Sequence, residues 1–415
     1  MLELDVRREF DPAHEQEFFA AVPERAGVLL VEPRAAGGQP HLVRTADLRR
    51  AAERLLRPPE PLSKRLNLRE VTAAIRYRVT GSKFEQTLAL YHQAKQRLPE
   101  RYRDLLRLRR LALLKVNLRN DYPRCYVTRR LRADGGFYFG PFASRRAADA
   151  FAEGFLDLFK IRRCQIKIRR DPAYPGCIYS EMKMCLAPCF AGCTREEYDA
   201  EVTRVLETLD TTGAALIAAL ERERAEASAA LNFERAALLH KRIEKASDAL
   251  RGLPELARRI ENLDAVILQR TAEEKTVALF ILRGGLLDEP VFLRFGELSS
   301  QPKSIDAILR QTLQPPLAAA EPADKLASPP DSPGHPPPHP PIDPPRDLHA
   351  GLRAAPPELA ENLMLVARWF YSKPREGEIL FREKEWPYRR ILRAIGRILA
   401  PPGAAPSAAA PPPNS

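Results

Sequence analysis

Four cysteines lie close together in the middle of the sequence, where their side chains could bind a metal. Cys164, Cys177, Cys185 and Cys189 follow the spacing C-x12-C-x7-C-x3-C, and Cys193 adds a further C-x3-C step. Four thiolates can hold either an iron–sulfur cluster or a structural zinc ion, since both take four sulfur ligands. Buried cysteines without a ligand are the alternative, and Cys193 is either a spare thiol or another fourth ligand. We predict a metal site formed by the first four.

Basic residues are concentrated on both sides of an aromatic run. Residues 97–134 carry 12 Lys and Arg against four Asp and Glu, and the stretch KIRRCQIKIRR at residues 160–170 contains no acid. Segregated arginines without paired acids favour binding to phosphates, so the surplus predicts a nucleic-acid surface rather than an ordinary solvated face. The candidate DNA-binding residues are Arg107, Arg109, Arg110, Lys115, Arg119, Arg129, Arg130, Arg162, Arg163 and Lys167.

The aromatic run between these tracts has two interpretations. Phe137, Tyr138, Phe139 and Phe142 could stack on unpaired bases, or they could belong to a hydrophobic core. We favour the core, because clustered aromatic residues serve that role more often.

Composition limits the classes of protein that this chain can be. It has 415 residues with a formal charge of +12, and 13 of its 39 prolines fall within residues 315–345. Six more follow residue 400, and such stretches do not form helices or sheets, so we expect a disordered linker and tail. No window reaches the 18 consecutive apolar residues of a membrane span, and the start MLELDVRREF does not resemble a secretion signal. Six cysteines are too few for a disulfide scaffold. We therefore expect a cytoplasmic protein with no membrane partner.

Hydrophobic periodicity predicts an α+β protein of several units. Strands at residues 26–32, 40–44 and 71–79 and helices at 47–56 and 84–98 indicate a small α/β unit. Residues 199–250 are strongly helical, with Asn232 as an N-cap, and indicate a hairpin whose apolar seam contacts the rest of the protein or a partner. Alternation after residue 263 predicts three strands, which need support from the helices before them or from residues 304–313.

The predicted division of the chain follows these patterns and the proline content. The units are residues 23–103 (α/β), 104–198 (basic and cysteine-rich), 199–252 (helical hairpin), 260–312 (small β unit), 313–357 (proline-rich linker), 358–399 (short helical basic segment) and 400–415 (tail). The role of residues 358–399 has two equal explanations, a packed terminal cap and a second nucleic-acid contact.

Several motifs in this order resemble the middle of the UvrC family of excinuclease proteins. They are DYPRCYVTRR at residues 121–130, YFGPF at 138–142, CLAPC at 185–189, EEY at 196–198, LNFERAALL at 231–239 and FILRGGLL at 280–287. The resemblance covers about residues 23–300. It implies a GIY-YIG endonuclease unit at the N-terminus, a [4Fe-4S] cluster on Cys164, Cys177, Cys185 and Cys189, and a UVR hairpin that docks on UvrB, with Phe233 as a candidate contact. For the metal, the resemblance favours iron–sulfur, and zinc remains the alternative.

The departures from this family fall on its first nuclease site. The family's two tyrosines correspond to Leu29 and His41, its catalytic arginine to Ala51 and its metal-binding glutamate to Leu90 or the adjacent Tyr91. Cleavage of a phosphodiester by such a site needs an activated nucleophile and a metal carboxylate. We therefore expect this unit to be inactive.

The family's second nuclease, an RNase H-like domain, is also expected to be missing. The proline-rich linker begins where that domain would start, and residues 296–312 leave no room for it. The sequence thus resembles a shortened UvrC with a degenerate GIY-YIG unit.

Three functions are compatible with these observations. The first is a DNA-binding protein of nucleotide excision repair that contacts DNA and UvrB without cutting. The second is an active UvrC-type endonuclease whose site is built from neighbours such as His41, Arg49, Tyr77 or Glu85. The third is a UvrB-interaction module that does not bind DNA. We favour the first.

Overall fold

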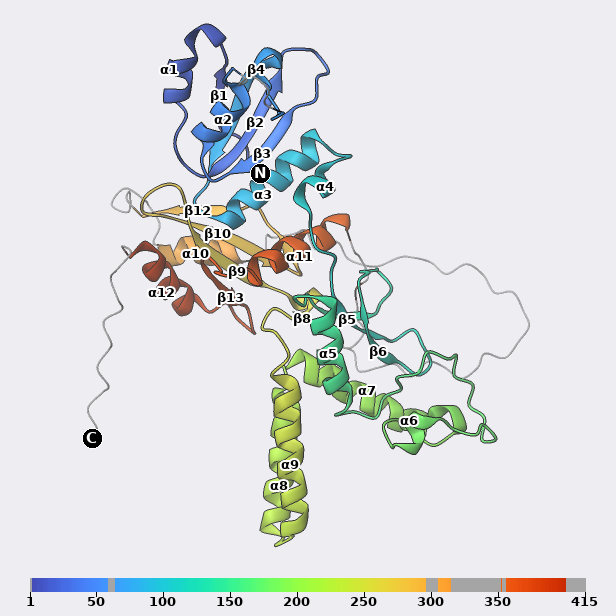
Figure 1. Cartoon of the computed structure of the whole chain (residues 1–415). Coiled ribbons are helices and arrows are strands. Elements are labelled where there is room, and N and C mark those ends of the chain that lie inside the picture. The colour runs from blue at the N-terminus through green and yellow to red at the C-terminus, as the bar shows by residue number, and fades with distance from the viewer. Residues whose placement is uncertain (1, 59–63, 296–304, 315–351, 353–355, 401–415) are drawn as a thin grey trace, which may run out of the picture.

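The computed structural model describes residues 2–58, 64–295, 305–314, 352 and 356–400. Three antiparallel sheets with helices packed on them form an elongated body, and one helical hairpin projects from it (Figure 1). The α+β class expected from the sequence is confirmed. Most of the proline-rich linker and the tail, for which disorder was expected, lie outside the described residues.

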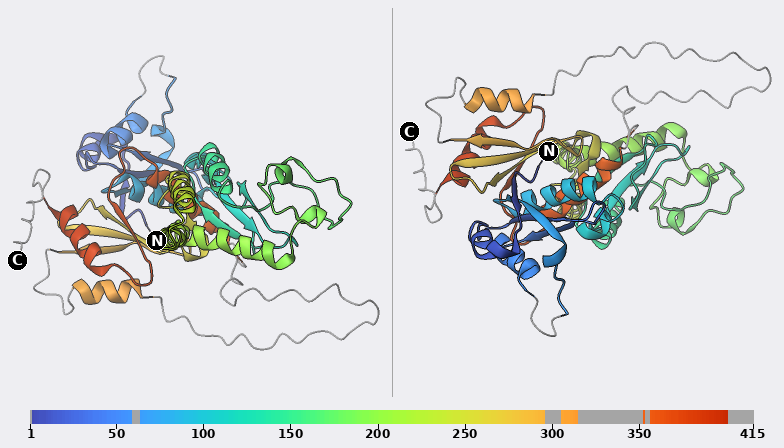
Figure 2. Two further views of the ribbon diagram at one scale, coloured as in Figure 1. Left: turned by 90° about the horizontal axis from the view of Figure 1, so that it is seen from below. Right: turned by 90° about the horizontal axis from the view of Figure 1, so that it is seen from above.

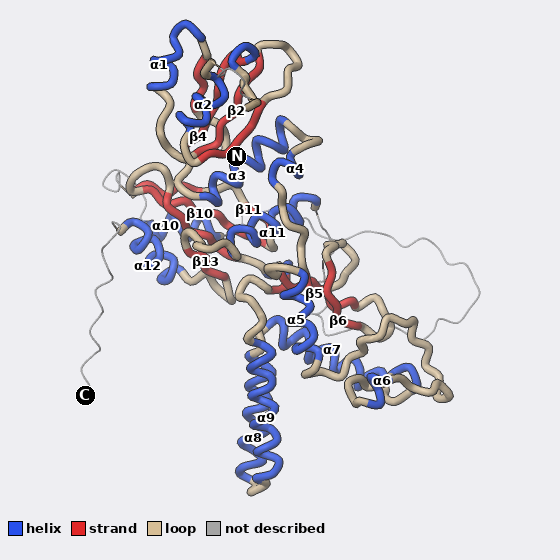
Figure 3. The backbone as a smooth tube through the Cα atoms, in the orientation of Figure 1, coloured by secondary structure: helices blue, strands red, loops and turns tan. Residues whose placement is uncertain are grey.

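The N-terminal unit is a four-stranded sheet with helices on both faces (Figure 3). Its strands run in the order β1-β4-β2-β3 and comprise β1 (Val6–Glu9), β2 (Gly27–Pro33), β3 (His41–Thr45) and β4 (Thr72–Val79). Its helices are α1 (Glu15–Ala20), α2 (Leu48–Leu56), α3 (Lys83–Arg97) and α4 (Tyr102–Leu106), with 3-10 turns at Pro12–His14 and Arg69–Val71. The strands and helices predicted for residues 26–98 are present. The structure adds β1 and α1, which pack Phe10, Phe18 and Phe19 into the same core.

The middle unit is a second sheet, in the order β6-β5-β7-β8. Its elements are β5 (Leu113–Asn117), β6 (Arg124–Thr128), β7 (Phe137–Gly140), β8 (Arg258–Arg259), α5 (Arg145–Leu156), α6 (Ile178–Glu181), α7 (Arg195–Asp210) and a 3-10 turn at Pro188–Phe190. Phe137, Tyr138, Phe139 and Phe142 are all at most 3% exposed. The core interpretation of the aromatic run is therefore confirmed, and stacking of these rings on bases is excluded by their burial.

The helical hairpin consists of α8 (Ala214–Ala229) and α9 (Phe233–Leu250). Asn232 caps α9 as predicted, since its Oδ1 accepts the Arg235 N–H at 3.1 Å. The first apolar stripe of the predicted hairpin, which includes Val202 and Leu206, belongs instead to α7 and packs on the middle sheet. The projecting hairpin thus begins at Ala214.

The C-terminal unit is a sheet in the order β11-β10-β9-β13, with β12 also paired to β10. Its elements are β9 (Ala265–Arg270), β10 (Thr276–Arg283), β11 (Leu286–Leu287), β12 (Val291–Arg294), β13 (Glu378–Phe381), α10 (Ile305–Leu313), α11 (Pro357–Phe370), α12 (Tyr388–Leu399) and a 3-10 turn at Ile260–Asn262. Helices α10 and α12 cover one face and α11 covers the other. The strands of this sheet therefore pack against α10, in agreement with the expected support from residues 304–313, and also against helices within residues 356–399.

Helices α3 and α11 pack in one core and so connect the N-terminal unit with the C-terminal unit (Figure 2). Phe84 of α3 contacts Phe280 of β10 edge to face, with ring centroids 5.1 Å apart. The buried carboxylate of Glu361 in α11 accepts hydrogen bonds from Tyr91 (2.7 Å) and Tyr102 (2.5 Å) of the N-terminal unit. Residues 358–399 therefore form a packed cap, as one of their two explanations proposed.

Candidate functional site

The cysteine segment is a loop anchored to the middle sheet and to α7. The Leu186 N–H donates to the Lys160 carbonyl at 2.9 Å, and the Lys160 N–H donates to Glu201 of α7 at 2.6 Å. The fully buried Tyr198 accepts the Arg162 N–H and donates its own hydroxyl to the Pro123 carbonyl. The start of the loop is thus fixed on ordered elements.

The structure brings the four predicted cysteines into one neighbourhood. Burial, with smaller contributions from the nearby Cys164, Cys189 and Cys177, raises the pKa of the Cys185 thiol to about 11. Cys193 differs from them, because it is buried in the core of the middle unit beside Cys189 and Glu197. Cys125 lies buried in β6, as expected of an ordinary strand residue.

Tight backbone turns shape the cysteine loop. Ala187 and Ala191 both adopt left-handed conformations, with φ of 57° and 61°. The Ala187 N–H points at the Cys185 sulfur at 3.3 Å. An amide that donates to sulfur favours a thiolate, which is the form that binds metals.

The donor set therefore fits a metal that takes four sulfur ligands, although the side chains are not in ligand geometry. Within the part of the chain that the structure describes, no group of three or more His, Cys, Asp or Glu is arranged so as to hold a metal ion. The cysteine site therefore stays a prediction.

The positions that the sequence resemblance assigns to the family's first nuclease site are filled by buried or half-buried residues. Leu29 of β2, Ala51 of α2 and Leu90 of α3 are 0%, 3% and 4% exposed. His41 of β3 is half-buried, and burial together with the nearby Arg54 lowers the pKa of its imidazole. These residues provide neither a carboxylate for a metal nor a hydroxyl for the reaction.

The neighbours considered as an alternative site do not converge. His41 pairs with Val31 and Tyr77 pairs with Leu29, which places both on the face of the sheet that packs on α2. Glu85 lies on α3, which covers the opposite face, and its carboxylate accepts the Gly81 N–H at 2.8 Å and pairs with Arg78. Burial raises the pKa of Glu85. Arg49 donates to the Val22 carbonyl and to Glu24.

Three of the candidate DNA-binding residues already have partners within the protein. Lys115 is buried and pairs with Asp134. Arg162 is buried and donates to the carbonyls of Tyr122 (2.7 Å) and Ile166 (2.8 Å), and Arg163 pairs with Asp157 at 2.7 Å. These side chains hold the fold together, so their charge is not free for a phosphate.

The other seven candidates are exposed. Within the described residues, no side-chain hydrogen bond or ion pair is found for Arg107, Arg109, Arg110, Arg119, Arg129, Arg130 or Lys167. Their charges therefore remain available to a ligand.

The tip of the hairpin carries large apolar side chains in solvent. Leu231, Phe233 and Leu238 are 73%, 66% and 63% exposed. Leu231 lies in the turn between α8 (Ala214–Ala229) and α9 (Phe233–Leu250). The tip points away from the body (Figure 1). Exposed apolar clusters of this kind mark interaction sites.

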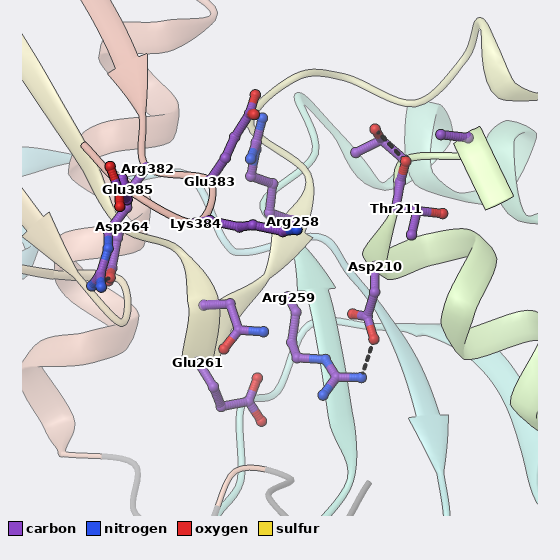
Figure 4. A pocket seen from close by; sticks show the side chains of 13 residues that line it. Asp210, Thr211, Arg258, Arg259, Glu261, Asp264, Arg382, Glu383, Lys384 and Glu385 are labelled. Atoms are coloured by element: carbon purple, nitrogen blue, oxygen red, sulfur yellow. Dashed lines mark hydrogen bonds and ion pairs between the residues drawn. The ribbon is translucent and has the colours of Figure 1, made fainter. Parts of the chain in front are cut away.

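A large cavity of about 1050 Å³ opens where the middle unit meets the C-terminal unit (Figure 4). Its lining mixes both charges, with Arg259 paired to Asp210 and Arg382 paired to Asp264 at 3.1 Å. Among the described residues, the two buried carboxylate oxygens of Glu261 have no hydrogen-bond partner of good geometry, although the Leu352 amide approaches them. Burial raises the pKa of Glu261 to about 7.

The comparisons with known proteins point to one family. The family model described as the UvrC/Cho excinuclease middle domain matches residues 111–208, from just before β5 to near the end of α7. The UvrABC system protein C of Carboxydothermus hydrogenoformans is 30% identical over 282 residues, which is 67% of this chain and 46% of that protein. The chain belongs to the UvrC family.

The UvrC likeness covers part of each protein. The UvrABC system protein C of Dehalococcoides mccartyi is 28% identical over 273 residues, which is 66% of this chain and 45% of that protein. The chain thus spans under half the length of these two UvrC relatives. No solved structure matches it. The matched middle domain contains the whole cysteine loop.

Two side chains of this UvrC-family chain were not predicted as functional. Arg368 of α11 lies beside the exposed arginines of residues 107–110, and Arg44 of β3 lies close to it, since both Arg44 and Arg109 affect its pKa. No local pattern could have indicated this, because 258 residues separate Arg368 from Arg110. In the described residues, no helix is both long enough and apolar enough to span a membrane.

Proposed function

We propose that this UvrC-family chain is a cytoplasmic DNA-binding protein of nucleotide excision repair whose N-terminal unit does not cut DNA. The observation that carries the proposal is the burial of Leu29, Ala51 and Leu90 at the positions of the family's catalytic residues. An apolar core at these positions provides no metal ligand and no group to activate a nucleophile. The exposed, unpaired arginines support retention of DNA.

An incision assay tests this proposal. Purified chain is incubated with a lesion-bearing duplex and Mg²⁺ or Mn²⁺, with and without UvrA and UvrB. We expect a retarded protein–DNA complex and no strand cleavage. Metal-dependent cleavage that disappears in His41→Ala or Glu85→Gln would overturn the proposal in favour of an active endonuclease.

For the cofactor, we propose a [4Fe-4S] cluster held by Cys164, Cys177, Cys185 and Cys189. The chemistry of four gathered thiols and an amide that donates to sulfur supports it. When bound, the cluster would supply a cross-link between loop segments that have little regular structure. Broad visible absorption of anaerobically purified protein, with iron and sulfide by analysis, is the expected result. Colourless protein that carries zinc would overturn it.

For the partner, we propose that the hairpin tip binds a UvrB-like protein through Phe233 and its apolar neighbours. Their exposure supports this, since nothing in the chain's own core requires them. Capture of the chain by immobilised UvrB should be lost in Phe233→Asp. The control is Lys241→Asp, an exposed change on the same helix, which should bind normally. Capture of the chain by UvrB without any retardation of DNA would favour the alternative function, a UvrB-interaction module that does not bind DNA.

A further inference from the structure

Two adjoining cavities lie where α11 meets the segment that links the N-terminal unit to the middle sheet. The first, of about 430 Å³, is enclosed by residues 107–111, residues 141–143 and α11. The second, of about 230 Å³, lies between α11, the start of α3 and β3. Arg368 and Ser372 line both cavities, so the two form one continuous groove. We call it the basic groove, and its arginines are Arg44, Arg107, Arg109, Arg110 and Arg368.

The basic groove has almost no negative charge of its own. The first cavity has four arginines and no acid in its lining. The single acid of the second cavity, Glu376, already pairs with Lys83 at 3.5 Å and accepts the Lys83 N–H at 2.8 Å. Among the described residues, none of the five arginines has an ion-pair partner. The charge of the groove is therefore uncompensated.

These like charges act on one another. Burial lowers the pKa of the Arg368 guanidinium, and the neighbouring Arg44 and Arg109 lower it further. Gathering cations in this way is unfavourable for the free protein, because the charge of each arginine repels the charges of the others. A polyanion seated in the groove would remove that repulsion.

Arg368 is held in place before any ligand arrives. Its Nη1 donates to the Leu106 carbonyl at 2.7 Å, and its other nitrogens have no hydrogen bond within the described residues. Helix α11 is fixed by its buried apolar face, which includes Leu363 and Val366, both 0% exposed. At its end, the Tyr371 hydroxyl donates to the Pro141 carbonyl at 2.9 Å. A cation preorganised on a rigid helix binds an anion with little loss of side-chain entropy.

The other arginines reach the groove through a sharp turn. Arg107 ends α4 in a left-handed conformation with φ of 48°, and its N–H donates to the Arg103 carbonyl at 3.1 Å. The turn directs Arg109 and Arg110 along the first cavity before β5 begins at Leu113. Three distant parts of the sequence thus contribute charge to one surface.

We propose that the basic groove binds the phosphodiester backbone of a DNA strand and that α11 supplies its central cation. Arginine suits this ligand because its planar guanidinium can bind phosphate oxygens in pairs. Charges distributed over two joined cavities suit successive phosphates better than a single anion. The inference rests on the proposed DNA binding and assigns it to a specific surface.

The groove recognises the backbone and not the bases. Three of the four aromatic residues in its lining, Phe84, Phe142 and Trp369, are only 2%, 3% and 5% exposed, and the half-buried Tyr371 uses its hydroxyl to bind the Pro141 carbonyl. Contacts to phosphates without base readout give binding that is independent of sequence and sensitive to salt. The same arginines should therefore serve every duplex or single strand.

The test compares two variants from which the same charge has been removed. One is Arg109→Gln/Arg110→Gln/Arg368→Gln in the groove, and the other is Arg389→Gln/Arg390→Gln/Arg393→Gln on α12. The α12 arginines are exposed, have no carboxylate partner among the described residues, and lie on the opposite face of the C-terminal sheet. Binding of fluorescently labelled duplex and single strand is measured by anisotropy over a series of salt concentrations.

We expect the groove variant to bind duplex at least about tenfold more weakly and to reduce the slope of log K against log salt by about 2 to 3, since each lost phosphate contact changes it by about 0.9. The α12 variant should stay close to wild type. Arg109→Gln/Arg110→Gln alone removes two exposed side chains without protein partners and keeps the test valid if the Arg368 change destabilises the fold. Its slope should change by about 2.

Three outcomes would contradict the inference in different ways. Equal losses in the groove and α12 variants would overturn the groove while leaving DNA binding intact. A wild-type chain that binds no DNA would overturn the proposed function itself. Competition by polyglutamate as effective as that by unlabelled DNA would show that the groove takes any acidic chain, and would overturn its assignment to DNA.

Discussion

The N-terminal unit and the cysteine loop differ in what they share with the UvrC family. The first keeps a folded core, and the second keeps its candidate ligand residues. The N-terminal unit keeps a complete sheet, N-caps on α2 and α3 and a closed core, yet apolar side chains occupy three of the four positions to which the sequence resemblance assigns catalytic groups. The cysteine loop has one helix of four residues and one 3-10 turn, yet Cys164, Cys177 and Cys189 lie near enough to Cys185 to raise its pKa. Packing alone can preserve a fold, whereas a site persists only through particular residue types. Likeness of fold therefore does not carry activity from one protein to another.

The largest effect is expected from breaking the thiol set. Cys185→Ser should reduce bound iron and sulfide to background and destabilise the middle unit by at least about 3 kcal/mol, because metal binding energy contributes directly to the folding of such loops. Metal analysis and urea denaturation provide the measurements. Cys193→Ala, which changes the core thiol, should keep the metal. Loss of the metal in Cys193→Ala but not in Cys185→Ser would instead assign the role of ligand to Cys193.

The N-terminal unit should resist the return of its family's carboxylate. Leu90 is 4% exposed, so Leu90→Glu would bury a charge without a partner and should lower the free energy of unfolding by about 3 to 5 kcal/mol. Gln96→Glu adds the same carboxylate on the exposed side of α3 and should be nearly neutral. Denaturation curves of both variants test this. A stable Leu90→Glu protein would mean that the site has space for its lost ligand.

A smaller effect is expected at the junction of the middle and C-terminal units. Because the pKa of Glu261 is raised to about 7, the folded state binds this proton more tightly than the unfolded chain. Its contribution to stability is present at about pH 4.5 and is lost as the pH rises through about 7, amounting to about 1 to 3 kcal/mol.

Glu261→Gln keeps the shape of the side chain without the ionisation. The variant should lose this part of the pH dependence and be more stable than wild type at pH 8. Denaturant midpoints at pH 5 and pH 8 measure the difference. Parallel pH profiles for the two proteins would show that Glu261 does not titrate in this range.

The smallest effect on stability is expected at the hairpin tip. Phe233 is 66% exposed, so Phe233→Asp should change the free energy of unfolding by less than about 0.5 kcal/mol while it abolishes partner capture. Leu239 in the same helix is 4% exposed, and Leu239→Asp should destabilise the hairpin strongly. Thermal melting of both variants distinguishes a contact residue from a core residue. Equal melting losses would assign Phe233 to the core.

Local signals in the sequence predicted most of the individual elements. The N-cap at Asn232 and the alternation in β9 and β10 are short-range patterns, and the structure contains them. Strand β1 was not predicted, because its sequence VRRE has the polar character of an edge strand. The burial of Lys115 and Arg162 was also not predictable, since their partners come from loops whose positions depend on the complete fold.

The placement of α11 illustrates what the sequence does not reveal. Its apolar stripe predicts a buried face, but not which surface covers it. Glu361 binds Tyr91 across 270 residues, and no periodic pattern records such a distance. The cysteine loop lies between these cases, because its candidate ligands could be proposed from spacing while its anchors on Tyr198 and Glu201 could not.

Strand β13 joins the edge of β9, and Ile379 pairs with Ile267. During synthesis, β9 therefore leaves the ribosome long before β13, its neighbour in the sheet, has been made. The apolar face of α3 likewise stays partly uncovered until α11 has been made. Folding of this part is expected to be slow and to finish after translation, because contacts so distant in sequence require closure of a long loop. Closure entropy grows only logarithmically, so halving or doubling the proline-rich tract should change stability by about 0.6 kcal/mol. The length of this connection should therefore matter little, whereas cutting it would turn an intramolecular contact into one that depends on protein concentration.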